Sequence, residues 1–227
     1  MRASLREGSV NKVYTYQQVV YAVSSMNQPT PEERALLAFE QAGGVLRTSE
    51  ALKLRIHPRT LYGLRDQGLL ERVSRGVYRL SDLAPLGNPD LVRVALRVPK
   101  SVVCLISALD FHGLTAEIPH EVQIALPRGS KEPRVKQPPI RVFRFSESAY
   151  REGIETHRVD GIDVRIYGAA KTVADCFKFR NKIGLDVALQ ALRSGVEEQR
   201  FRPAELMKFA RVCRVQDIVR PYLEILV

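Results

Sequence analysis

A stretch of about fifty residues, 31–80, constrains the fold most, because its periodicity and its glycines and prolines outline a complete small domain. Pro31 suits a helix start, and the apolar stripe that follows it stops at Gly43 and Gly44, which predicts a first helix. Thr48 can then cap a short second helix. The pattern predicts two consecutive helices separated by a glycine turn.

The second half of this stretch continues with a third helix and a hairpin. Pro58 opens the helix, and Gly68 ends it with a residue that tolerates the left-handed conformation. Segments 69–73 and 77–80 predict two strands around 74–76, with a glycine where a bulged hairpin needs a positive φ. Helices followed by a hairpin in this order predict a winged helix-turn-helix, a module that usually binds DNA.

The third helix is the predicted DNA-reading element. Placing Leu61 and Leu64 against the core turns the remaining side chains outward, at about 100° per residue. Gly63 leaves room for close backbone approach, and Arg65, nearer the buried flank, suits a phosphate contact. The predicted DNA-binding residues of this helix and of the hairpin are Arg59, Thr60, Tyr62, Gly63, Arg65, Arg72, Arg75 (at the wing tip) and Arg79.

Charge supports a nucleic-acid partner. Segment 53–79 holds seven basic and two acidic residues, and the whole chain has a formal net charge of +10. Phosphate neutralisation by such a patch predicts salt-sensitive binding, although a basic helix face that is merely solvated is the alternative. An anionic membrane surface would also fit the charge. No run of about 18 apolar residues occurs, and the N-terminus lacks the apolar core of a secretory signal, so we expect a soluble cytoplasmic protein.

The remaining sequence predicts a second, mixed domain. Residues 1–30 predict a partly flexible arm, 81–89 a linker, and 90–227 the second domain. Its periodicities predict helices at 90–98 and 101–112, strands at 121–126 and 140–145, a hairpin of 158–159 and 162–167, and helices at 169–177, 185–194, 203–212 and 215–226. The order predicts an α+β fold: a winged helix-turn-helix, then a small antiparallel or mixed sheet and a C-terminal helical bundle.

Two segments of the second domain predict additional basic surface. One is the extended, proline-containing loop 127–139 and the other is the helical region that follows residue 169. A solvated helix face explains the second segment equally well. The residues concerned are Arg128, Lys131, Arg134, Lys136, Lys171, Lys178, Arg180 and Lys182.

Residues typical of catalysis or metal binding do not form recognisable constellations. The four histidines make no close ligand pair, and the three cysteines, Cys104, Cys176 and Cys213, lie in apolar surroundings, which favours buried free thiols. Asp175 and Asp186 are expected to decorate helices. We therefore predict no enzyme, no metal and no cofactor, and the missing acidic cluster disfavours a nuclease.

Four segments together resemble the AbiEi family of type IV antitoxins: GGVLRTSEALKLRIHPRTLYGLRDQGLLERVSRGVYRL, SALDFHGLT, IALPRG and VRIYGAAKTVADCFKFRNKIGLDVALQALR. The resemblance covers roughly residues 31–227, and only the N-terminal arm departs from the short family start. It implies an N-terminal winged helix that represses the antitoxin–toxin operon, and a C-terminal domain that counteracts a nucleotidyltransferase-like toxin without a stable protein complex. The DNA-binding role transfers to Arg59, Thr60, Tyr62, Arg65 and Arg75, whereas the antitoxin role transfers only as a domain.

These observations predict a transcriptional autorepressor and antitoxin that binds double-stranded DNA at inverted repeats in its own promoter, as a monomer in solution or a dimer on DNA. No membrane partner is expected. The alternative is a winged-helix repressor whose C-terminal domain senses a ligand or oligomerises, without antitoxin activity.

Overall fold

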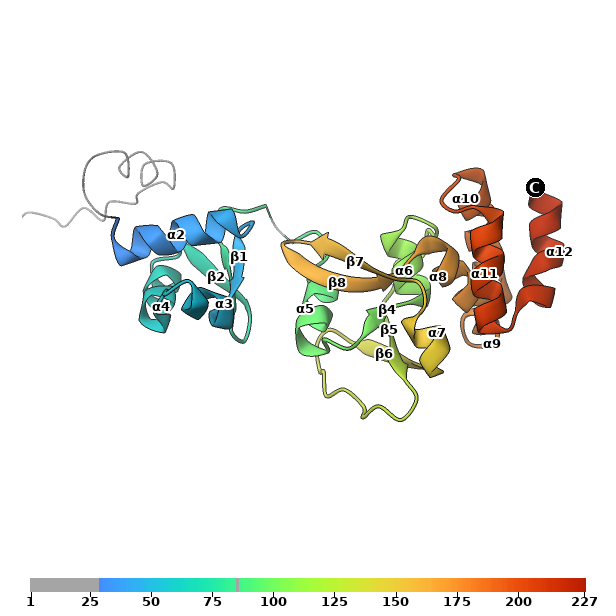
Figure 1. Cartoon of the computed structure of the whole chain (residues 1–227), viewed down its shortest axis with the longest axis horizontal. Helices are drawn as coiled ribbons and strands as arrows, with labels where there is room; N and C mark the ends of the chain where they lie inside the picture. The colour runs from blue at the N-terminus through green and yellow to red at the C-terminus, as the bar shows by residue number, and fades with distance from the viewer. Residues whose placement is uncertain (1–28, 85) are drawn as a thin grey trace, which may run out of the picture. The chain divides into compact units, whose positions relative to one another are not determined.

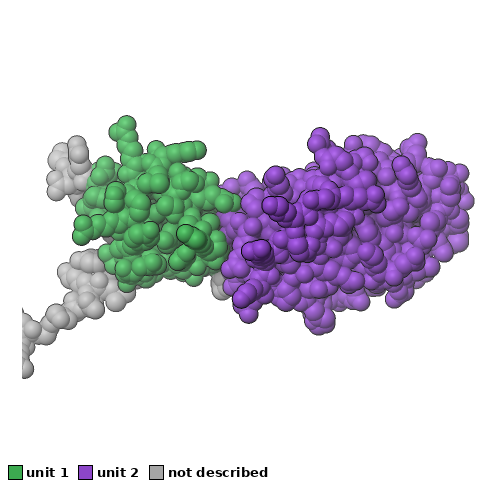
Figure 2. Space-filling view, turned by 90° about the horizontal axis from the view of Figure 1, so that it is seen from below, with its two compact units in different colours: residues 1–85 green, residues 86–227 purple. Residues whose placement is uncertain are grey.

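The computed structural model describes residues 29–84 and 86–227, so the predicted N-terminal arm lies almost wholly outside the described residues. The chain divides into two compact units, residues 1–85 and 86–227, which Figure 2 distinguishes by colour. No helix in the described part is long and apolar enough to cross a membrane.

Unit 1 contains helices α2 (Pro31–Gln41), α3 (Thr48–Lys53) and α4 (Pro58–Asp66). A reciprocal capping box starts α2: the Glu33 amide donates to Thr30 Oγ1 and the Thr30 amide donates to Glu33 Oε2. Such a box satisfies two backbone donors that a helix start otherwise leaves without partners.

The predicted capping role of Thr48 is wrong. Arg47 is the residue before α3, and its backbone amide donates to Glu50 Oε2 over 2.8 Å. Thr48 Oγ1 instead donates to the Gly76 carbonyl in the hairpin turn, over 3.3 Å. The hydroxyl thus ties the start of α3 to the wing rather than closing its own helix.

Three antiparallel strands complete unit 1: β1 (Val45–Arg47), β2 (Leu70–Ser74) and β3 (Val77–Leu80), in the order β1-β3-β2. The hairpin is as predicted, with a bulge between Arg72 and Ser74 and a φ of 74° at Gly76, whereas β1 was not predicted. Figure 1 shows the helices gathered against this sheet. The arrangement is consistent with the predicted winged helix-turn-helix.

Unit 2 contains a five-stranded mixed sheet with the order β6-β5-β4-β8-β7. Its strands are β4 (Val102–Val103), β5 (Val122–Pro127), β6 (Ile140–Phe145), β7 (Ile154–Val159) and β8 (Ile162–Tyr167). The pairs β5–β6 and β4–β8 are parallel, and the other two pairs are antiparallel. Asp160 and Gly161, with φ values of 49° and 78°, turn the β7–β8 hairpin as predicted.

The predicted helix 101–112 is wrong at its start, because Val102 and Val103 form the central strand β4 and the helix α6 runs only from Leu105 to Phe111. The other helices of unit 2 are α5 (Pro89–Arg97), α7 (Glu147–Arg151), α8 (Ala169–Lys178), α9 (Arg180–Ile183), α10 (Leu185–Glu197), α11 (Pro203–Cys213) and α12 (Gln216–Leu226). The short helices α7 and α9 were not predicted. Helix α8 packs against α6, α10 and α11, and every residue from Ala170 to Phe177 is buried.

Candidate nucleic-acid interface

Helix α4 presents one face to the core and the other to solvent, as its sequence pattern predicts. Leu61 and Leu64 are fully buried, whereas Arg59 is exposed and Tyr62 retains 46% of its accessible surface. A Cβ added to Gly63 would meet nothing within 4 Å, so this position offers open space for a close approach. The exposed face therefore combines a cation, an aromatic ring and an unobstructed glycine.

The start of α4 is fixed by the turn before it. His57 Nδ1 accepts a hydrogen bond from the Arg59 amide over 3.1 Å, and Pro58 occupies the first helical turn. Arg55, exposed in this turn, has a φ of 60°. Lys53 and Arg55 thus add two exposed cations before the helix. The sequence analysis included them in the net charge of the segment but not among the predicted DNA-binding residues.

Arg65 is partly engaged within the protein. Its Nε and Nη2 donate to Asp66 Oδ1 over 2.9 and 2.6 Å, and its guanidinium lies 5.5 Å from the centre of the Tyr62 ring. The hydrogen bond that Arg65 donates to Asp66 raises the pKa of Arg65, so the guanidinium stays charged. A phosphate contact by Arg65 would compete with its ion pair to Asp66. The predicted phosphate-binding role therefore requires that Arg65 leave Asp66 for the phosphate.

The wing supplies a second exposed element. Arg75 lies in the turn between β2 and β3 and is exposed, and among the ion pairs of the described residues none involves Arg59 or Arg75. Arg72 is also exposed, but its Nε donates to the Ser74 carbonyl over 3.2 Å and so supports the bulge. The side chains of Arg72 and Arg75 therefore both remain accessible to the phosphate backbone of DNA.

Arg79 is not part of this surface, contrary to prediction. It is 4% exposed, its Nη1 lies 2.8 Å from Glu71 Oε1, and its Nη2 donates to the Ala84 carbonyl. The reason is that β3 is the middle strand of the sheet and Glu71 stands directly opposite Arg79 in register. Opposite charges on facing strand positions predict such a pair, and that signal could have separated Arg79 from the other arginines.

Lys171 and Asp175 are both buried, so their predicted exposure is wrong. Lys171 is 0% exposed; its Nζ donates to both carboxylate oxygens of Asp175, over 2.7 and 2.5 Å, and lies 4.1 Å from the Tyr167 ring centre. Cys213 Sγ donates to the same carboxylate over 3.1 Å. Burial raises the pKa of Asp175 and Lys171 opposes that rise. The cause is the central position of α8, which other elements cover on all sides.

The remaining predicted basic residues of unit 2 fall into three groups. Lys131, Arg134 and Lys136 are exposed along the loop that follows β5. Arg180 is half-buried and donates to the Phe177 carbonyl over 2.9 Å, while the Lys182 ammonium lies 6.0 Å from the Phe143 ring centre. Arg128 and Lys178 line one cavity together with Arg144 and Arg214, two residues that the sequence reasoning did not select.

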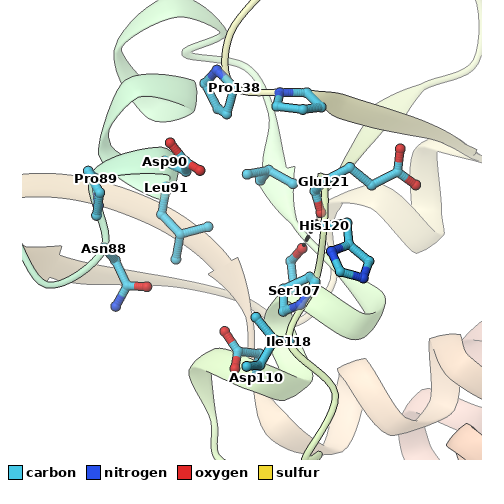
Figure 3. Close-up of a pocket in the computed structure, with 13 residues that line it drawn as sticks. Asn88, Pro89, Asp90, Leu91, Ser107, Asp110, Ile118, His120, Glu121 and Pro138 are labelled. Atoms are coloured by element: carbon cyan, nitrogen blue, oxygen red, sulfur yellow. Dashed lines mark hydrogen bonds between the residues drawn. The ribbon is translucent and has the colours of Figure 1, made fainter.

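A second cavity in unit 2, drawn in Figure 3, contains several ionisable groups and measures about 200 Å³. Asp90, Asp110 and Glu121 line it, and burial raises the pKa of Asp110. Ser107 Oγ donates to the Glu121 carbonyl and accepts from the Gln123 amide, so it holds two backbone segments together. Within the described residues, no group of three or more His, Cys, Asp or Glu side chains is arranged to hold a metal ion.

All three cysteines are free and buried, as predicted. Burial raises the pKa of the Cys104 and Cys176 thiols well above the ordinary value. A raised pKa keeps a thiol protonated and unreactive. The thiols therefore act as small packing groups and, in Cys213, as a donor to the buried carboxylate.

Comparison with solved structures gives a likeness over most of the chain. The crystal structure of the RV2827C protein from Mycobacterium tuberculosis aligns with a TM-score of 0.52 and 14% sequence identity, covering 88% of this chain and 83% of that one. At this identity the likeness concerns the fold alone. Among curated proteins, none matches this sequence.

Comparison with protein families gives a match in unit 1. Residues 33–81 match the family model described as "Transcriptional regulator, AbiEi antitoxin". These residues include α3, α4 and the whole wing, and therefore the exposed cations of unit 1 described above on these elements. The predicted resemblance is therefore confirmed over residues 33–81, where the chain is similar to the AbiEi antitoxin transcriptional regulators.

Proposed function

We propose that this protein is a DNA-binding transcriptional autorepressor and a type IV antitoxin, which counteracts a nucleotidyltransferase-like toxin without forming a stable complex with it. The observation that carries the proposal is the exposed face of α4, in a segment that matches AbiEi antitoxin transcriptional regulators. Unit 1 would bind the DNA and unit 2 would provide the antitoxin activity. No catalytic step is assigned to the chain.

The chemistry of the α4 face supports DNA reading. Arg59 carries a guanidinium that has the geometry for a bidentate contact to guanine in the major groove. Tyr62 and Thr60 offer further contacts from the same helix, and the Arg75 side chain on the wing suits a phosphate. Two copies on an inverted repeat would each read one half-site, which permits a monomer in solution and a dimer on DNA.

The test is binding of the purified full-length protein to its own upstream DNA, compared with a scrambled duplex of equal length and composition, across a salt series. We expect a preference for the upstream duplex and an affinity that falls steeply with salt, because each phosphate contact releases counterions. Equal affinity for both duplexes at every salt concentration would remove autorepression from the proposal.

The antitoxin part needs a separate test in cells that express the adjacent toxin gene. Full-length protein should rescue growth, and the Arg59→Ala variant should rescue equally well while losing repression of a promoter reporter. Co-purification of a stable complex with the toxin would contradict the type IV mechanism. Cleavage of plain duplex DNA by purified protein and Mg²⁺ would contradict the absence of a catalytic step.

A further inference from the structure

A cavity of about 260 Å³ in unit 2 gathers four cationic side chains from four separate parts of the chain. Arg128 follows β5, Arg144 lies in β6, Lys178 is the last residue of α8, and Arg214 follows α11. Convergence of charges from elements this far apart in sequence requires the folded unit. Holding four like charges around one space costs free energy unless an anion occupies it.

Arg144 lines this cavity and keeps one donor group without a partner in the described parts of the chain. One terminal nitrogen, Nη2, lies 2.5 Å from Glu132 Oε2, and the other, Nη1, is buried without a hydrogen-bond partner in the described parts of the chain. A buried donor without an acceptor is destabilising, and more so when it carries charge. Because the same guanidinium lines the cavity, an anion bound there would offset the positive charge that this nitrogen shares.

The acidic and polar groups at the cavity leave its positive character intact. Asp175 contributes to the lining, but Lys171 already pairs with it over 2.5 Å. The hydroxyls of Ser146 and Ser148 also line the cavity, with their oxygens 3.4 Å apart. Serine hydroxyls and basic side chains together are donors that suit the several oxygens of a phosphate group.

We infer that this cavity binds the phosphate group of a small molecule, either a free phosphate or pyrophosphate or a nucleoside phosphate, with Arg144, Lys178 and Arg214 as its charged ligands. A volume of about 260 Å³ lies just below the range of roughly 300–1,000 Å³ for pockets that take drug-sized ligands, so it accommodates a phosphate and part of the molecule that carries it. Autorepression and antitoxin activity require no such ligand, so the inference goes beyond the proposed function.

The experiment is isothermal titration calorimetry of the full-length protein at constant ionic strength. The titrants are inorganic phosphate, pyrophosphate, ATP and a 5′-hydroxyl single-stranded oligonucleotide. We expect saturable binding of at least one of the three small phosphates. Tightest binding of ATP would identify a nucleoside phosphate as the source, and equal or tighter binding of pyrophosphate or phosphate would identify the free anion. Binding of the oligonucleotide alone would overturn the inference in favour of a nucleic-acid backbone.

Two variants locate the binding. Lys178→Gln and Arg214→Gln remove exposed cavity cations, and each should weaken binding about tenfold or more, because a charge-assisted hydrogen bond is lost. Arg211→Gln is the matched control: it removes an equal charge from α11 at an exposed position that does not line the cavity, and it should change affinity less than about twofold. Equal weakening by all three, or no saturable binding by the unmodified protein, would overturn the inference. Operator binding by unit 1 should be unaffected in either case.

Discussion

The sequence predicts both Arg59 in unit 1 and Lys171 in unit 2 on a binding surface, but the folded protein exposes the first side chain and buries the second. Arg59 is exposed near the start of α4, whereas Lys171 is 0% exposed and paired with Asp175. Helix α4 covers one side of a small core, but α8 is surrounded by other helices and the sheet. A helical pattern predicts which residues face outward only when the helix has a solvent face.

The two basic sites also differ in how the chain assembles them. The exposed cations of the predicted DNA-binding surface in unit 1 come from one short segment, 53–75, whose prolines and glycines already predict the helix and the wing. The cavity of unit 2 joins residues between 128 and 214, and its charges meet only through the sheet and the packing of α8 and α11. The local sequence pattern therefore predicts the basic surface of unit 1, whereas the cavity of unit 2 forms through packing between residues that are distant in sequence.

The largest expected effect concerns the buried pair. Lys171→Met should lower the free energy of unfolding of unit 2 by about 3–5 kcal/mol, because it leaves the Asp175 carboxylate buried without its partner. Since the chain has no tryptophan, urea unfolding would be followed by circular dichroism. Lys182→Met, at an exposed position of α9, is the control and should cost less than about 0.5 kcal/mol.

The pH dependence of this variant sharpens the interpretation. Burial already raises the pKa of Asp175, and removing Lys171 removes the charge that opposes the rise. A carboxyl with a folded pKa above its unfolded value adds stability at low pH that is lost as the pH rises. The loss in Lys171→Met should therefore be smaller at pH 5 than at pH 8. A loss that is small and independent of pH would show that the pair does not stabilise unit 2.

The second prediction concerns Arg59, the exposed residue of the two compared above. Arg59→Ala should weaken binding to the upstream DNA by about 1–3 kcal/mol and relax sequence choice, because a base contact contributes to discrimination as well as affinity. Folding should be unaffected, since the side chain is exposed. Electrophoretic mobility shifts with upstream and scrambled duplexes measure both quantities.

A matched control separates base reading from general charge. Arg34→Ala removes an exposed cation from α2, outside the predicted reader helix, and should leave the preference for upstream DNA unchanged. If Arg59→Ala left operator affinity unchanged as well, α4 would not be the reader helix.

The features that sequence could predict are those with strong local signals. Helix α4 and the wing follow from Pro58, Gly68 and Gly76, and the β7–β8 hairpin follows from Asp160-Gly161. The strands β1 and β4 were missed because they hold only three and two residues and exist through pairing with distant strands.

The site residues follow the same division. Arg59 and Arg75 lie where the local pattern puts them, whereas Arg79 is buried because β3 became the middle strand. Arg144 and Arg214 carried no local signal, since an arginine in a strand or after a helix resembles any solvated residue. Only the folded unit brings them to one cavity with Lys178.

The third prediction is a smaller effect at the wing. Arg75→Ala should lower the slope of log affinity against log salt by about one, with little change in the ratio between upstream and scrambled DNA, because a phosphate contact releases a counterion without reading sequence. The measurement is the same binding assay over a fourfold range of salt. A changed preference between duplexes would instead place Arg75 at a base edge, and an unchanged slope would place the wing away from the DNA.

The smallest expected effect concerns a polar group that unit 2 partly buries. His112 Nε2 donates to the Tyr167 carbonyl over 2.7 Å, and burial lowers the pKa of His112 below its ordinary value of 6.5. The unfolded chain then binds a proton more readily, so the stability contributed by neutral His112 is complete above pH 6.5 and is lost as the pH falls below that value.

The variant His112→Gln keeps an N–H donor but cannot titrate, and its melting temperature should fall less between pH 7.5 and pH 5.5 than that of the unmodified protein. His120→Gln, at an exposed position, should leave the dependence unchanged. Identical slopes in the unmodified protein and His112→Gln would mean that the imidazole is as free to take up a proton in unit 2 as in the unfolded chain. The contrast between the outward groups of unit 1 and the enclosed groups of unit 2 would then not extend beyond the Lys171–Asp175 pair.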